Sequence, residues 1–208
     1  MTQQEVRSYG FWYRVIGAAF ALIHPLRIIG RENIPEEGPL VVAANHTSLT
    51  DPLCAVFAFR RRDYLLPMSK IEARKIPVIG RILHRVGVIF VDRGAADMKA
   101  AKAALHLLRN KGKLLIFPEG TRIRNGVDKN GNPPEAKGGA ALFATRSGAA
   151  LMPMYIPEKK KWFFGRSTIV IGKPYYPQIA GRKATTEELD AITKELMERL
   201  HALEELAV

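Results

Sequence analysis

The chain has 208 residues, of which 47% are hydrophobic and 25% charged, a globular composition that excludes collagen-like, low-complexity and disordered classes. Its 32 lysines and arginines exceed 20 acidic residues and give a formal net charge of +12, which favours anionic partners such as nucleic acid, anionic lipid or phosphorylated substrates. The single cysteine, Cys54, can close no internal disulfide and excludes a cysteine-cluster zinc site, which fits a reducing compartment such as the cytoplasm.

The first predicted element is an amphipathic helix that ends near Pro25, with residues 2–7 as a frayed start. Its longest charge-free apolar stretch, Val15 to Leu26, has 12 residues. A helix of this length covers about 18 Å of a roughly 30 Å hydrocarbon core, so it cannot span a bilayer. One helical face carries Phe11, Val15, Ala19, Leu22 and Leu26. We expect residues 1–27 to form an anchor helix that lies in a membrane interface, and the alternative is that this face packs on the protein's own core.

Residues 28–208 are expected to form one domain in which strands alternate with helices. The predicted strands cover residues 26–29, 40–44, 64–68, 87–91, 113–117, 151–156 and 168–171. The predicted helices cover residues 51–59, 77–85, 97–110, 138–146 and 185–206. This alternation predicts an α/β fold with a mostly parallel central sheet flanked by helices. Ligand sites in such sheets lie beyond the carboxyl ends of strands, where His46, Arg93 and Glu119 fall.

The most informative polar stretch is Asn45-His46-Thr47-Ser48-Leu49-Thr50-Asp51. Histidine suits proton transfer at neutral pH, and a carboxylate can fix its tautomer and stabilise the imidazolium. The two side chains can meet only if His46 lies on a loop and Asp51 at the start of a helix, as the strand, loop and Asp-Pro pattern predicts. The alternative is that Asp51 is only a helix N-cap and His46 only a loop residue.

A second polar stretch, Pro118-Glu119-Gly120-Thr121-Arg122, follows a hydrophobic strand. The glycine allows a ligand to approach the backbone, and the arginine can bind phosphate oxygens in a bidentate manner. Glu119 can orient Arg122, bind a ligand hydroxyl or satisfy turn amides. Arg93 also follows a hydrophobic strand and can add a second phosphate contact, or pair with Asp92 at the surface.

Several other chemistries lack their sequence patterns. The chain has no Gly-x-Ser-x-Gly turn of an α/β-hydrolase. It also has no Walker loop, no Gly-x-Gly-x-x-Gly and no His-Glu-x-x-His pattern. The remaining histidines have no partners at metal-ligand spacing. We therefore expect neither a metal site nor a resident cofactor.

Four blocks occur in order along the chain: Asn45-His46-x4-Asp51, Val88 to Arg93, Phe117-Pro118-Glu119-Gly120-Thr121-Arg122, and Met152-Pro153-Met154-Tyr155-Ile156. Together they resemble the four motifs of the glycerolipid acyltransferase family, in particular its short bacterial lysophosphatidic acid acyltransferases. The resemblance covers about residues 28 to 175. In two places the chain differs from this pattern: the loop from Arg124 to Ala136 is long and polar, and the fourth block has methionines where valines are commoner.

The resemblance implies direct transfer of a fatty acyl group from acyl-CoA or acyl carrier protein to the sn-2 hydroxyl of lysophosphatidic acid, which gives phosphatidic acid. It implies His46 as general base and Asp51 as its orienting carboxylate. It further implies that the acceptor phosphate binds at a set of six residues: Arg93, Glu119, Gly120, Thr121, Arg122 and Lys137. Acylation of glycerol-3-phosphate or of another lysophospholipid is the enzymatic alternative.

A non-enzymatic alternative is a basic peripheral module for anionic lipid or nucleic acid, which explains the charge but gives no reason for His46 with Asp51. We expect no nucleic-acid partner.

We expect a peripheral or monotopic protein on the cytoplasmic face of the cell membrane, bound to its anionic surface. The anchor helix and the segment from Lys159 to Phe164, in which three lysines precede three aromatic residues, would provide the contact.

Overall fold

A computed structural model describes residues 2–92, 97–128 and 130–207. The strands are β1 (Leu26–Ile29), β2 (Leu40–Ala44), β3 (Leu65–Lys70), β4 (Ile89–Val91), β5 (Lys113–Ile116), β6 (Ala150–Tyr155) and β7 (Ser167–Ile171). The α-helices are α1 (Gln3–Ile23), α2 (Asp51–Ala58), α3 (Ile79–Arg85), α4 (Met98–Arg109), α5 (Gly139–Ser147) and α6 (Thr186–Ala202). Short 3₁₀ helices occur at Arg31–Asn33, Arg61–Asp63, Ile71–Lys75 and Glu204–Ala207. Each predicted strand and helix is present; β1 and β2 have the predicted ends, and the ends of the others differ by at most a few residues.

The described strands form one sheet in the order β1-β7-β6-β2-β5-β3-β4. All neighbouring strands are parallel except β6 and β7, which are antiparallel. The prediction of a mostly parallel sheet is therefore confirmed. Because β6, β2 and β5 are parallel neighbours, the loops that leave their carboxyl ends emerge side by side at one edge of the sheet.

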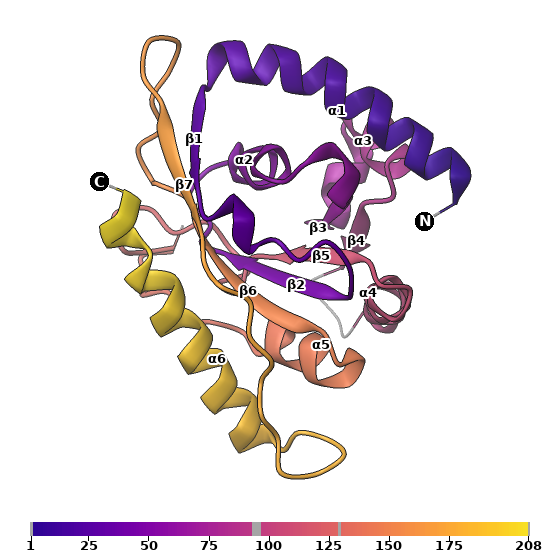
Figure 1. Cartoon of the computed structure of the whole chain (residues 1–208), viewed down its shortest axis with the longest axis vertical. Coiled ribbons are helices and arrows are strands. Elements are labelled where there is room, and N and C mark those ends of the chain that lie inside the picture. The colour runs from indigo at the N-terminus through magenta and orange to yellow at the C-terminus, as the bar shows by residue number, and fades with distance from the viewer. Residues whose placement is uncertain (1, 93–96, 129, 208) are drawn as a thin grey trace.

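Helices cover both faces of this sheet, as Figure 1 shows with α1 and α2 on one side and α4, α5 and α6 on the other. The fully buried strand β2 divides its side chains between the two layers. Val41 and Ala43 pack with residues of α4, α5 and α6, whereas Leu40, Val42 and Ala44 pack with α2. The continuous apolar run Leu-Val-Val-Ala-Ala is what a strand buried on both faces requires.

The N-terminal helix α1 lies over α2 at the periphery of the molecule (Figure 1). Thr2 and Glu5 form a capping box, in which each side chain accepts a hydrogen bond from the other residue's amide, so the prediction of a frayed start is wrong. The helix packs on the core through its buried residues Tyr9 and Phe20.

The apolar face predicted for α1 does not cover the protein's own core. Its residues Phe11, Val15 and Leu22 are 58%, 49% and 72% exposed, and we call them the exposed stripe of α1. Leu26, which was expected on the same face, belongs to β1. No helix within the described ranges is long and apolar enough to cross a bilayer.

Candidate active site

His46 and Asp51 meet in the loop between β2 and α2. The Nδ1 atom of His46 lies 2.9 Å from Oδ2 of Asp51, and Asp51 is completely buried. The same oxygen accepts hydrogen bonds from the amides of Thr47 and Ser48, each at 2.6 Å. The alternative, in which Asp51 is only a helix N-cap, is therefore wrong: Thr50 is the N-cap, Asp51 is the first residue of α2, and its carboxylate holds the loop that carries His46.

The backbone of His46 is fixed from the loop after β5. Its amide donates to Oε2 of Glu119 at 2.7 Å, and its carbonyl accepts from the amide of Ile123 at 2.7 Å. The imidazole stacks on Phe117 with ring centroids 4.3 Å apart and an interplanar angle of 25°. These contacts leave the imidazole one orientation, with Nδ1 toward Asp51 and Nε2 as the nitrogen that remains for a substrate.

Glu119 is buried and satisfies a loop amide, which is one of the three roles that the sequence allowed. Burial raises the pKa of this carboxyl to about 7, against the opposing effect of the hydrogen bond from the His46 amide. This interaction directs the side chain toward the backbone of His46. The first of the three alternatives was that Glu119 orients Arg122. The hydrogen bond of Glu119 instead goes to the His46 amide.

Lys160 also reaches Asp51, although sequence reasoning assigned this lysine to a lipid-facing loop. Its Nζ lies 2.6 Å from Oδ1 of Asp51, and its side chain is only 5% exposed. The expectation that Lys160 faces a membrane is therefore wrong. Burial alone would raise the pKa of Asp51, but the His46 hydrogen bond, the Lys160 charge and the loop amides together lower it, so that the carboxylate is ionised at neutral pH.

Asn45 joins the loops after β2 and β6. Its amide nitrogen donates to the carbonyl of Ile156 and its oxygen accepts from the amide of Ile156, both at 2.8 Å. Arg124 adds a hydrogen bond from Nε to the carbonyl of Thr47 at 3.2 Å. Three loops that are distant in sequence are thereby linked around His46. The sequence contained the motif that includes Asn45, but no local signal showed this partner 111 residues away.

The predicted phosphate-binding residues occupy the loop after β5 and its continuation. Gly120 has φ +66°, and a Cβ there would lie 3.4 Å from the Lys137 side chain. The amide of Lys137 donates to the carbonyl of Pro118, which brings the long polar loop back to the strand end. Arg122 and Lys137 are exposed, and Thr121 is half-buried. Arg93 lies outside the described residues.

A thiol also lies close to the pair. Cys54, on the first turn of α2, is completely buried, and burial raises its pKa to about 12. A thiol in this state is protonated and is no nucleophile at neutral pH. Among the described residues, no group of three or more His, Cys, Asp and Glu side chains is placed to hold a metal ion.

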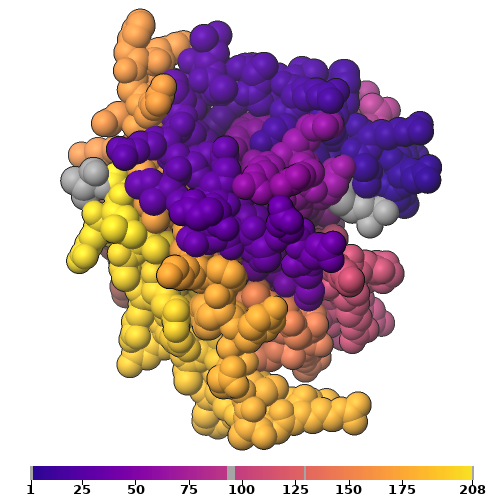
Figure 2. Space-filling model, viewed as in Figure 1, coloured from indigo at the N-terminus to yellow at the C-terminus, as the bar shows by residue number. Residues whose placement is uncertain are grey.

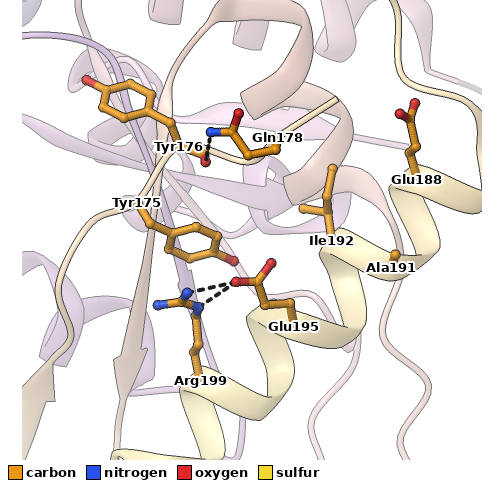
Figure 3. A pocket seen from close by; sticks show the side chains of 8 residues that line it. All are labelled: Tyr175, Tyr176, Gln178, Glu188, Ala191, Ile192, Glu195 and Arg199. Atoms are coloured by element: carbon orange, nitrogen blue, oxygen red, sulfur yellow. Dashed lines mark hydrogen bonds and ion pairs between the residues drawn. The ribbon is translucent and has the colours of Figure 1, made fainter. Parts of the chain in front are cut away.

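A separate hollow of about 360 Å³ lies along α6, lined by residues of that helix and of the segment after β7. Within it, Arg199 pairs with Glu195 and its guanidinium lies 4.2 Å from the ring centroid of Tyr175, as the side chains in Figure 3 illustrate. None of its lining residues belongs to the loops that carry His46, Asp51 and Lys160. The hollow is therefore not part of this site.

The family model described as "Acyltransferase" matches residues 25–157, which include β2, β5, β6 and the loops around His46. This span is more than half of the chain. The chain therefore belongs to the acyltransferase family.

Two relatives and one solved structure show how far the similarity extends. The chain is 30% identical over 142 residues to the 1-acyl-sn-glycerol-3-phosphate acyltransferase of Borreliella burgdorferi, a match that spans 65% of this chain and only 52% of that protein. It is 26% identical over 205 residues to the protein of the same name from Bacillus subtilis, which covers 94% and 96% of the two chains. The crystal structure of the 1-acyl-sn-glycerophosphate acyltransferase PlsC from Thermotoga maritima superposes with a TM-score of 0.69 at 23% identity, over 97% of this chain and 79% of that chain. The last comparison supports the fold.

Proposed function

We propose that this protein transfers a fatty acyl group from a thioester to the sn-2 hydroxyl of lysophosphatidic acid, which forms phosphatidic acid for phospholipid biosynthesis. The names of the Borreliella and Bacillus relatives support this acceptor. The acyl donor is acyl-CoA or acyl carrier protein, and both present the same thioester carbonyl.

The contact between His46 Nδ1 and Asp51 Oδ2 carries the proposal. With Nδ1–H donated to Asp51, Nε2 of His46 has a lone pair that can accept the proton of the acceptor hydroxyl. The hydroxyl oxygen then attacks the thioester carbonyl, the C–S bond breaks, and the proton passes from His46 to the leaving thiolate. The products are an ester and a free thiol, and no acyl-enzyme forms.

The loop from Gly120 to Arg122, together with Lys137 and Arg93, would bind the acceptor phosphate. Arginine provides paired donors for phosphate oxygens, and the lysine side chain, which lies against Gly120 where a side chain would otherwise be, adds a second charge. Glu119 would contribute to catalysis indirectly, because its carboxyl group accepts a hydrogen bond from the amide of His46 and so holds the backbone of that residue.

The acceptor is a lysolipid, so the site would work at a membrane surface. The helix end and the 159–164 segment are joined, since the amide of Phe163 donates to the carbonyl of Ile23 and Trp162 lies 4.2 Å from the His24 ring. Figure 2 shows the N-terminal segment and this orange loop next to one another at the upper margin of the molecule. Trp162, Phe163 and Phe164 are exposed, like the exposed stripe of α1. This combination of aromatic, aliphatic and basic residues fits peripheral binding to the cytoplasmic face of an anionic membrane.

A parallel assay tests the proposed reaction. The full-length protein is offered lysophosphatidic acid, glycerol-3-phosphate or a zwitterionic lysophospholipid, each with acyl-CoA and with acyl carrier protein as donor. We expect product only from lysophosphatidic acid at a useful rate, and a rate about 10² to 10⁴ times lower with His46→Ala. Preferential acylation of glycerol-3-phosphate or of the zwitterionic lipid would identify a different acceptor, and no transfer to any acceptor would refute the proposal.

A further inference from the structure

Lys160 has an environment unlike that of its neighbours in the chain. Its ammonium lies 2.6 Å from Oδ1 of Asp51, 3.3 Å from Oγ1 of Thr47 and 3.0 Å from the carbonyl of Pro157. Three oxygen atoms thus meet the three hydrogens of the ammonium group. Lys159 and Lys161 are not buried in this way, because both are exposed.

The ammonium group of a lysine is seldom buried in a folded protein. A long side chain of this type normally buries its methylene groups and keeps the ammonium in water. In this chain the ammonium is the buried end, and a carboxylate lies against it. Such a pair requires good geometry to offset its desolvation, which the three contacts provide.

The charges around Asp51 come from several elements. His46 and Lys160 contact the two carboxylate oxygens, Cys54 lies on the same first turn of α2, and Arg124 binds the carbonyl of Thr47. Glu119 accepts a hydrogen bond from the His46 amide. The Lys160 ammonium balances the Asp51 carboxylate, so the site is closer to neutral before His46 takes up a proton. Without Lys160 a negative charge would be left buried, and the His46–Asp51 pair would gain a proton more readily.

We propose that Lys160 is a positioning residue, which holds the loop after β6 on Asp51 and keeps the His46–Asp51 pair unprotonated at neutral pH so that His46 can act as a base. This inference rests on the proposed acyl transfer for its kinetic consequence. Lys160 lies beyond residue 157, where the match to the family model ends.

The test compares Lys160→Met with wild type in the full-length protein, by the pH dependence of kcat/KM for lysophosphatidic acid and acyl-CoA. We expect the acid limb to move to higher pH by about one unit, which is about a tenfold loss at pH values below the midpoint. Lys160→Arg keeps the positive charge, so its acid limb should stay close to the wild-type position.

A matched control is Lys113→Met. Lys113 is another buried lysine, with a side chain that is 7% exposed and lies 4.0 Å from Asp63. It is the first residue of β5, so it lies at the opposite end of the strands from His46. Its loss should lower stability and leave the acid limb in place. An acid limb that is unchanged in Lys160→Met, or equally displaced in Lys113→Met, would overturn the inference.

A second readout does not depend on turnover. In protein labelled with ¹⁵N-histidine, the imidazole signals of His46, identified by their loss in His46→Gln, report when the pair takes up a proton. We expect this midpoint to rise in Lys160→Met. If wild type does not acylate lysophosphatidic acid, the proposed function fails while this measurement still tests Lys160; an unmoved midpoint refutes the role of Lys160 whatever the substrate.

If Lys160→Met does not fold, a comparison of Asp51→Asn with the double variant Asp51→Asn, Lys160→Met replaces it, because the double variant leaves no unpaired charge. A residue that acts through Asp51 should add less than about a twofold further loss of kcat/KM in this background. A further loss of about tenfold or more would show that Lys160 acts independently of Asp51 and would overturn the inference.

Discussion

Replacing Asp51 with asparagine should destabilise the fold far more than loss of a helix cap would. Four donors point at the Asp51 carboxylate: the Nδ1–H of His46, the amides of Thr47 and Ser48, and the ammonium of Lys160. An asparagine oxygen can still accept from the two amides. Its NH₂ group then takes the place of Oδ1 and faces the Lys160 ammonium, so this charge stays buried without a counter-ion.

The magnitude follows from this unpaired charge. Removing one partner of a buried ion pair costs about 3 to 5 kcal/mol, whereas losing an N-cap costs about 1 kcal/mol. Because single domains are stable by only about 5 to 15 kcal/mol, Asp51→Asn should remain folded at 25 °C with a much lower urea midpoint.

Urea unfolding followed by circular dichroism at pH 7 measures this cost. Asp63→Asn is the control, since Asp63 is also buried but lies 4.0 Å from its lysine, so its loss should be closer to about 1 kcal/mol. The pKa of Asp51 is lower in the fold than in the unfolded chain. Its contribution is therefore complete above about pH 4 and shrinks as the pH falls below that value. If Asp51→Asn is no less stable than Asp63→Asn at pH 7, the account of Asp51 as the centre of a charged network is wrong.

Four further outcomes are expected. His46→Ala should lower kcat by about 10² to 10⁴ without changing the circular dichroism spectrum, and turnover within a few-fold of wild type would exclude His46 as the base. Arg122→Ala and Lys137→Ala should each weaken use of lysophosphatidic acid by about 1.5 to 3 kcal/mol and spare an uncharged monoacylglycerol; equal damage to both acceptors would assign these residues elsewhere. Glu119→Gln should become more stable relative to wild type as the pH rises from about 4.5 to 8, because the raised folded pKa, about 7, makes ionisation costly; urea midpoints that stay parallel across this range would contradict that cause. Serine at all three positions of the exposed stripe of α1 should reduce sedimentation with anionic liposomes and keep activity on detergent-dispersed substrate, whereas unchanged sedimentation would show that the stripe does not contact lipid.

The regular elements could be predicted from the sequence because burial leaves a recognisable pattern of apolar residues along the chain. The run from Leu40 to Ala44 is apolar throughout and becomes the central strand β2. The position of His46 at the carboxyl end of that strand followed from the same pattern. Local spacing was sufficient in both cases, because each depends on residues that are neighbours in the chain.

The contacts that complete the site could not be predicted in this way. Lys160 stands between two exposed lysines, in a segment without secondary structure, so no periodicity marked it as buried. Its partner Thr47 is 113 residues away in the chain. The Asp-Pro pair predicted a helix start correctly, and the pairing of Asp51 with His46 was expected, but the lysine that also binds the carboxylate comes from the remote loop after β6 and left no local signal.

The buried position of Cys54 makes this residue a natural reporter of local unfolding around the site. This is the single cysteine of the chain, and its protonated thiol lies inside the first turn of the helix that begins at Asp51. A thiol reagent can reach it only when this helix opens, so the labelling rate measures how often the region around Asp51 unfolds locally. Inhibition by such reagents would then report opening of the fold and would carry no information about a thiol intermediate. In the same way, a substrate that closes the site should protect Cys54 from labelling, which makes ligand occupancy measurable without any assay of product.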